Sequence, residues 1–162
     1  MRKPLMVNTT QDGSYQRLAF VGPLNEDAKT VLTPLAAAAG PRCILDMGGV
    51  TQVNSIGIRD WSHFLKVLKT GRELVYERVP DEVVRTMNMV TNFQGRLTVR
   101  SVFREYACTH CDHEQTEVYE LGRHYELGTV PSLAPVSCKS CGKVTEPVEP
   151  DDVYFSFLLA AG

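Results

Sequence analysis

The residues best suited to chemistry in this sequence are four of its five cysteines, which form two Cys-x-x-Cys pairs. The first pair is Cys108 and Cys111, and the second is Cys138 and Cys141. Two intervening residues let a tight turn point both sulfur atoms at one ion, and two such turns supply tetrahedral S₄ coordination. This ligand set suits Zn²⁺ and leaves no open position for catalysis. The spacing therefore predicts structural zinc, although iron uses the same four ligands.

Other readings of the cysteines fit the sequence less well. A redox dithiol would place one pair near the start of a βαβ unit rather than two pairs in a terminal appendage. His110 and His113 lie beside the first pair, but four thiolates already complete the site. The 26 residues between the pairs exceed the usual compact spacing, so we expect a hairpin of residues 114–127 and a Pro-rich loop of residues 128–137 between two cysteine turns. Cys43 stands apart in an apolar run and is interpreted as a small buried hydrophobe.

The composition limits the class of protein that holds these cysteines. The chain has 162 residues, 43% of them hydrophobic, which is enough for a folded core. Its net charge of −2 gives no broad field for binding nucleic acid or an anionic membrane. No apolar run is long enough for a membrane span or a signal peptide. We therefore expect a soluble, cytoplasmic protein with no membrane partner.

The apolar pattern ahead of the cysteines predicts strands alternating with helices. An Asp-Gly turn joins two strands, residues 4–10 and 15–22. A helix follows, with Asn25 as its N-cap and Gly40 at its end. Strands are expected at residues 43–47, 73–79 and 96–107, with helices running from Ile58 to Gly71 and from Pro80 onward. This order favours an α/β fold with a mixed sheet. Residues 149–160 are expected to add a short C-terminal helix, with a strand as the alternative.

The stretch between the central strand and its helix, DMGGVTQVNSIGIRD, has polar and small residues where the helix should begin. Ser55 lies at that start, where a serine accepts a hydrogen bond from an unpaired backbone N–H. Phosphorylation at the same position would add about −1.5 to −2 charges, which the positive end of the helix dipole accommodates. The sequence supports both roles, a helix cap and a switch.

Three segments together resemble the STAS domain, the fold of bacterial anti-anti-sigma factors. The segments are LAFVGPLNEDA, CILDMGGVTQVNSIGI and LVYERVPDEVVRTMNMVTNF. The family's Asp-Ser-Ser/Thr-Gly loop aligns with Asn54, Ser55, Ile56 and Gly57, so two of its four positions differ here. The resemblance implies an STAS-like domain over residues 1–104, with the cysteines in a zinc-ribbon-like extension over residues 105–162.

The resemblance also implies the function. In the best-known members, the serine at the position of Ser55 is phosphorylated by an anti-sigma kinase, and the unphosphorylated form binds that kinase. We therefore expect a non-enzymatic, bacterial signalling module acting in transcription regulation. It would bind a kinase-like or sensor-like protein through residues 54–57 and the following helix. The sequence contains no nucleophile–base pair or phosphate-binding glycine loop.

The competing hypothesis is a transcription-associated zinc ribbon that binds nucleic acid. Few basic residues flank the cysteines, and the segment between the pairs is rich in glutamate, which argues against phosphate contacts. The sequence leaves homo-oligomerisation open.

Overall fold

A computed structural model describes residues 3–160; residues 1, 2, 161 and 162, which the expected domain ranges include, lie outside the described part. The chain begins with a five-stranded sheet in the order β1-β2-β3-β4-β5. Its strands are β1 (Met6–Asp12), β2 (Tyr15–Leu24), β3 (Arg42–Val53), β4 (Glu73–Glu77) and β5 (Thr98–Val99). The β1–β2 hairpin is antiparallel and the other pairs are parallel, so the predicted mixed sheet is confirmed.

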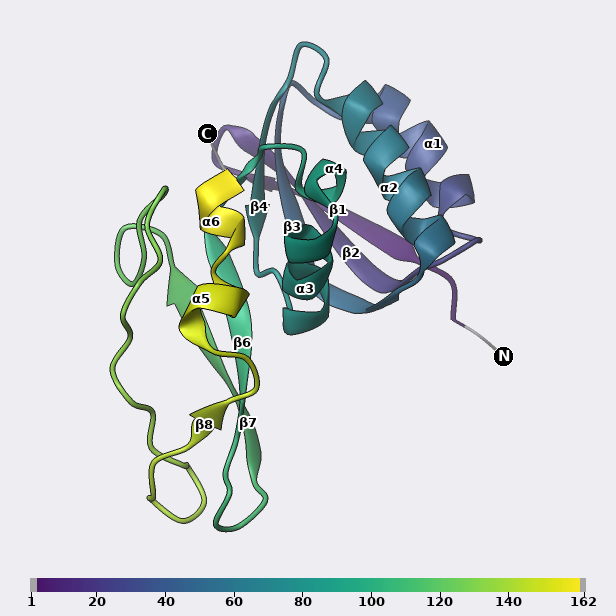
Figure 1. Ribbon diagram of the computed structural model, residues 1–162. Coiled ribbons are helices and arrows are strands. Elements are labelled where there is room, and N and C mark those ends of the chain that lie inside the picture. Colours follow the sequence, from purple (N-terminus) through teal and green to yellow (C-terminus); the bar gives the residue numbers. More distant parts are fainter. Residues whose placement is uncertain (1–2, 161–162) are drawn as a thin grey trace.

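Four helices accompany this sheet, and Figure 1 shows α1 and α2 side by side. They are α1 (Lys29–Ala38), α2 (Ser55–Leu68), α3 (Asp81–Met89) and the single-turn α4 (Thr91–Gln94), which the sequence did not predict. The expected bounds of the first helix are wrong. Asn25 accepts a hydrogen bond from the N–H of Asp27 in a turn that precedes α1, while Gly40 lies beyond its end and donates to Gln16.

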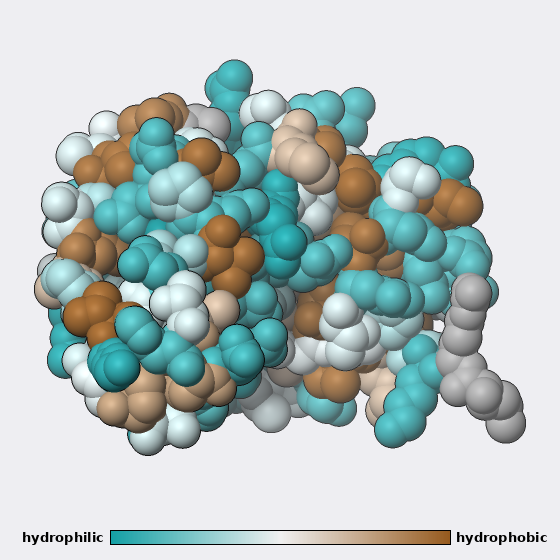
Figure 2. Space-filling model, turned by 60° about the horizontal axis from the view of Figure 1, so that its bottom comes forward, coloured by the Kyte–Doolittle hydropathy of each residue, from teal (hydrophilic) through white to brown (hydrophobic). Residues whose placement is uncertain are grey.

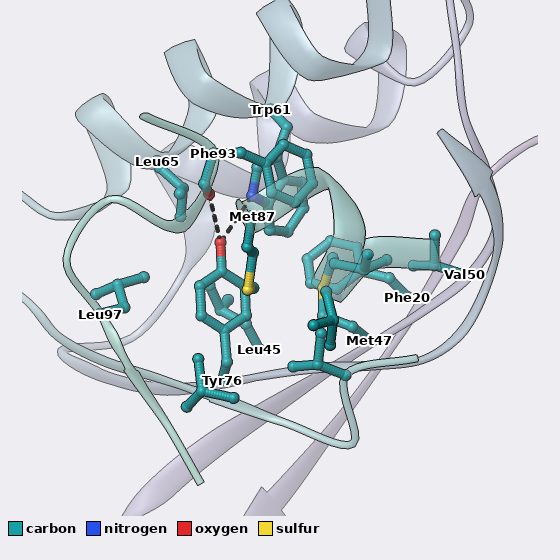
Figure 3. Close-up of a cluster of buried hydrophobic side chains, with 14 of the residues drawn as sticks. Phe20, Leu45, Met47, Val50, Trp61, Leu65, Tyr76, Met87, Phe93 and Leu97 are labelled. Atoms are coloured by element: carbon teal, nitrogen blue, oxygen red, sulfur yellow. Dashed lines mark hydrogen bonds between the residues drawn. The ribbon is translucent and has the colours of Figure 1, made fainter. Parts of the chain in front are cut away.

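The interior between this sheet and its helices is built around aromatic rings (Figure 3). Trp61 on α2 is fully buried and contacts Phe20, Phe64 and Phe93. Its Nε1–H donates to the Tyr76 hydroxyl at 2.9 Å, and that hydroxyl donates to the Phe93 carbonyl at 2.8 Å. Each of the three polar groups in this hydrogen-bonded series therefore has a partner, which removes the penalty for its burial.

The opposite face of the sheet carries charges, because side chains alternate along each strand. Asp46 on β3 is buried and lies 3.1 Å from the guanidinium groups of both Arg17 and Arg78. Arg17 also pairs with Asp12 and Glu77. The two guanidinium groups therefore offset the cost of burying the Asp46 carboxylate on β3.

The second sheet has the order β7-β6-β8 and begins almost where the first ends. The single strand predicted over residues 96–107 is divided: β5 belongs to the first sheet, and β6 (Ser101–Ala107) belongs to the second. β6 pairs antiparallel with β7 (Glu114–Glu120) and with the short β8 (Glu146–Pro147). The segment expected to form a hairpin by itself thus contributes one strand to a hairpin with β6.

The C-terminal segment returns to the first part of the molecule (Figure 1). The expected short helix is present as two single turns, α5 (Asp151–Tyr154) and α6 (Phe157–Ala160), both in contact with α3. Tyr154, Phe155, Phe157 and Leu158 are buried and belong to the same apolar cluster as Trp61. The extension therefore packs directly on the STAS-like sheet and its helices.

Candidate metal site and partner-binding loop

The two cysteine pairs converge at the tip of the second sheet. Cys108 Sγ lies 3.6 Å from Cys141 Sγ, and Cys111 Sγ lies 3.6 Å from Cys138 Sγ. All four sulfur atoms lie within 4.8 Å of one another. Tetrahedral coordination with Zn–S bonds of about 2.3 Å separates sulfur atoms by about 3.8 Å. The four cysteines are therefore placed to hold a metal ion, as the spacing predicted.

The two cysteine turns repeat one backbone arrangement. In the first, the N–H of Asp112 donates to the Cys108 carbonyl at 3.0 Å, and in the second the N–H of Gly142 donates to the Cys138 carbonyl at 2.9 Å. Both Asp112 (φ 60°) and Gly142 (φ 78°) adopt the left-handed conformation. This conformation suits glycine and is tolerated by aspartate, which explains the residue following each pair.

Backbone N–H groups aimed at sulfur favour the thiolate form that a metal requires. Hydrogen bonds from the N–H groups of Cys141 and Ser140 lower the pKa of Cys138 to about 6. The pKa of Cys108 is also lowered, first by the N–H of His110. Each turn therefore stabilises negative charge on its first cysteine.

Gln115, which was not identified from the sequence, connects the second cysteine turn to the β6–β7 hairpin. Gln115 on β7 is buried; its Oε1 accepts from the N–H of Lys139 at 2.8 Å, and its Nε2 donates to the Ser137 carbonyl at 3.2 Å. A glutamine between a glutamate and a threonine gives no sequence signal for this role. His110 and His113 are outside the cluster of ligand atoms, in agreement with the expectation.

The Ser55 loop, which we define as residues 54–57, lies at the start of α2. Asn54 is the N-cap: its Oδ1 accepts from the N–H of Gly57 at 2.8 Å, and its Nδ2 donates to Glu26. The expectation that Ser55 caps the helix is therefore wrong. Ser55 is the first helical residue, exposed, and its hydroxyl has no hydrogen-bond partner among the described residues. An amide oxygen accepts the capping bond as well as a hydroxyl does, and it lies one position earlier.

Gly57 sets the distance between this loop and the end of β2. A Cβ atom at Gly57 would lie 1.9 Å from the Leu24 carbonyl oxygen, far inside van der Waals contact. The N–H of Asn54 also donates to that same carbonyl at 3.1 Å. Gly57 is buried, while Asn54, Ser55 and Ile56 are exposed above it. The loop is thus held against the end of β2, with Ser55 and Ile56 exposed at the surface.

A groove of about 520 Å³ runs between α1 and α2 beside this loop. Its apolar lining comes from both helices, and its rim is mixed in charge. The lining residues are Lys29, Leu32, Thr33, Ala36, Arg59, Asp60, His63, Phe64 and Val67. The groove therefore offers both apolar and charged contacts along α1 and α2.

No protein-family model matches the chain, and no curated protein gives a significant match. Among solved structures, the chain is similar to an anti-sigma factor antagonist from Mycobacterium paratuberculosis, with a TM-score of 0.50 and 10% identity. The match covers 61% of this chain and 89% of that one. The chain has the STAS fold. The fold class inferred from the sequence is thereby confirmed.

In this STAS-fold protein, one charged side chain is buried that the sequence did not predict to be buried. Arg104 on β6 is 1% exposed, pairs with Asp151 at 2.6 Å and donates to the Glu149 carbonyl at 2.7 Å. Its guanidinium also lies over the rings of Tyr106, Tyr154 and Phe155. An alternating strand pattern predicts an outward arginine, and only the return of the C-terminal segment buries it.

Proposed function

We propose that this protein is a non-enzymatic signalling module that binds a partner protein through the Ser55 loop and α2, in the manner of an anti-sigma factor antagonist. The most direct support is that the residue capping α2 and the residue with an exposed hydroxyl are different residues of the loop. Asn54 caps α2, so the exposed hydroxyl of Ser55 is not needed to hold the fold. The STAS fold, shared with an antagonist of known structure, agrees with such a role.

Phosphorylation of Ser55 is the second part of the proposal. The hydroxyl lies at the first position of a 14-residue helix, where the backbone N–H groups and the helix dipole stabilise an anion. A phosphate there adds about −1.5 to −2 charges to the surface without removing the cap. The fold would then persist while the surface offered to a partner changes sign.

We also propose that the four cysteines bind a structural zinc ion and that the protein is cytoplasmic. Four sulfur ligands close the coordination shell, so the ion would hold the two turns together and activate no substrate. We propose that residues 105–162 form the zinc-ribbon-like extension and residues 1–104 the partner-binding domain. The described helices include none with the length and apolar character needed to cross a lipid bilayer.

Nucleic-acid binding by the extension is the weaker candidate. Lys139, one of the few basic residues near the cysteines, pairs with Glu117 at 3.1 Å. Three glutamates, at every third position, lie along β7. Phosphate contacts need unpaired cations, so this surface favours a protein partner.

The test compares Ser55→Ala and Ser55→Asp as affinity baits in lysate of the native organism. We expect Ser55→Ala to retain a partner that Ser55→Asp loses, with both variants folded. Thr51→Ala and Thr51→Asp, at an exposed position before the loop, are the matched controls. Identical capture by both Ser55 variants would contradict the switch, and capture unchanged by Ile56→Asp would contradict the loop as the binding surface.

A further inference from the structure

A second groove, of about 350 Å³, lies where the extension meets the STAS-like domain. Its walls come from three separate parts of the chain: the residues flanking the Ser55 loop, α3, and the C-terminal segment. We call it the junction groove, and its lining residues are Val53, Ile58, Glu82, Arg85, Thr86, Asn88, Met89, Glu149 and Val153. Because Val53 and Ile58 bracket residues 54–57, the groove is continuous with the Ser55 loop.

The apolar part of the junction groove is unusually open. Met89 is 77% exposed and Val153 is 47% exposed, although both lie among residues that pack α3 against α5. Ile56, in the adjacent loop, is 39% exposed. In Figure 2, hydrophobic side chains reach the surface in both halves of the molecule, separated by hydrophilic ones. Apolar side chains gathered at a concave junction are typical of a binding surface.

The polar part of the groove has unmet hydrogen-bonding capacity. Asn88 Nδ2 donates to the carbonyls of Val153 and Tyr154, which fastens the C-terminal segment to α3. Asn88 Oδ1 and Glu149 Oε2 are buried acceptors without a hydrogen bond in the described structure, and Arg85 Nε is such a donor. Buried polar atoms normally have partners, and two acceptors against one donor call for a ligand rich in N–H groups.

The charged residues around the junction groove also favour a ligand that donates N–H groups. Arg85 is already engaged by Asp81 at 2.9 Å and by Glu82 at 3.9 Å. Glu149 adds a further carboxylate on the opposite wall, and Asp152 is exposed beside it. The carboxylates thus outnumber the single guanidinium, so the groove favours a cationic side chain.

We infer that the junction groove binds a segment of a partner protein in which a large apolar side chain lies next to a lysine or arginine. The apolar side chain would pack on Met89 and Val153, and the cation would meet Glu149. This inference rests on the proposed function, since it extends the surface of the Ser55 loop across α3 to the extension. It gives the extension a direct part in recognition, because one wall of the groove is made by residues that follow the second cysteine pair.

The experiment is selection of a random twelve-residue peptide library on the full, zinc-loaded chain, followed by fluorescence polarisation with the enriched peptides. We expect enriched peptides to pair a large apolar residue with Lys or Arg. Val153→Asp and Glu149→Lys should each weaken their binding by roughly tenfold or more. The matched control is Val118→Asp, an exposed valine on β7 with the same exposure as Val153. Circular dichroism and metal content check that each variant is folded.

Each outcome decides the inference. Peptides that bind Val153→Asp and Glu149→Lys as tightly as the unchanged chain, peptides that are acidic, or no enrichment would each overturn it. A change in oligomeric state with Val153→Asp, seen by sedimentation, would mean that a second copy of the chain occupies the groove instead. The Ser55 variants separate the two proposals: identical capture by Ser55→Ala and Ser55→Asp removes the switch while leaving a peptide-binding groove intact.

Discussion

The STAS-like domain and the cysteine-bearing extension fill their interiors with different chemistry. The first surrounds Trp61 with aromatic and aliphatic side chains and admits few polar atoms. The second brings four thiols together at one end, and the strand that leads into it, β6, buries the charged Arg104 among three aromatic rings. A segment this small has too little apolar area for a core of its own, so specific polar and metal interactions replace it.

Metal removal should produce the largest difference between the two regions, because it should unfold the extension and leave the STAS-like domain folded. A Cys₄ zinc site contributes on the order of 10 kcal/mol of apparent binding free energy to folding. We expect chelation to abolish amide-exchange protection in β7 while the emission of Trp61, the only tryptophan and fully buried, stays unchanged. Cys141→Ser should reproduce the loss without chelator. A Trp61 red shift that tracks metal release would contradict the separation and show that both regions unfold together.

Replacing the buried charge should have the next largest effect. Arg104→Met removes one partner of a buried ion pair, which costs about 3–5 kcal/mol, toward the lower end because Asp151 remains partly hydrated. Urea unfolding followed by far-UV circular dichroism measures the loss. The control is Arg123→Met, an exposed arginine in the turn after β7. Equal stability of the two variants would mean that packing, rather than the guanidinium, holds the C-terminal segment.

Tyr76→Phe probes the polar chain inside the first region. It leaves the Trp61 Nε1–H and the Phe93 carbonyl unpaired in the interior, a loss of about 1–3 kcal/mol. Burial raises the pKa of the Tyr76 hydroxyl, so it stays protonated and able to donate. Thermal unfolding of Tyr76→Phe beside Tyr15→Phe, whose hydroxyl is at the surface, provides the comparison. No difference between them would argue that a water molecule replaces the hydroxyl.

The caps and turns should give the smallest effects. Asn54→Ala should lower the free energy of unfolding by about 1 kcal/mol, since the N–H of Gly57 loses its acceptor. Asn54→Ser should restore most of it, since a hydroxyl also accepts the capping bond, and Ser55→Ala should stay within about 0.5 kcal/mol because Ser55 is exposed and unpaired. Chemical denaturation measures these free energies of unfolding. A larger decrease with Ser55→Ala than with Asn54→Ala would show that Ser55 is the capping residue.

The left-handed residues of the cysteine turns allow a similar comparison within the extension. Gly142→Ala should weaken the second turn by about 1 kcal/mol, because an added Cβ disfavours its φ of 78°. Asp112→Gly, at the equivalent place in the first turn, should leave metal affinity unchanged or slightly higher. Competition with a chromophoric chelator measures both. A lower metal affinity with Asp112→Gly would show that the two turns are not equivalent.

Local patterns predicted the features that depend on local physics. The Asp-Gly turn, the apolar stripe of Trp61, Phe64, Leu65 and Leu68, and the cysteine spacing each appear in the structure as expected. Their signals reside in neighbouring residues, and nothing distant overrides them. The cap of α2 was placed one residue late because Asn54 and Ser55 are both good capping residues, and the sequence does not say which begins the turn.

The features that sequence reasoning missed depend on distant segments. The burial of Arg104 follows from the return of residues 149–158, about 50 positions later in the chain. The junction groove needs β3, α3 and α5 together, and its lining residues are unremarkable singly. The division of the strand over residues 96–107 follows from the partners on either side, β4 for one part and β7 for the other.

One residue, Arg100, stands between β5 and β6, and its backbone serves both sheets. Its N–H donates to the Tyr76 carbonyl of the first sheet at 2.8 Å, and its carbonyl accepts from the N–H of Leu121 beside the second at 2.8 Å. The extension is therefore joined to the first sheet directly, without a flexible linker between β5 and β6. Transplanting it onto another STAS-fold protein would require carrying this edge strand along with it.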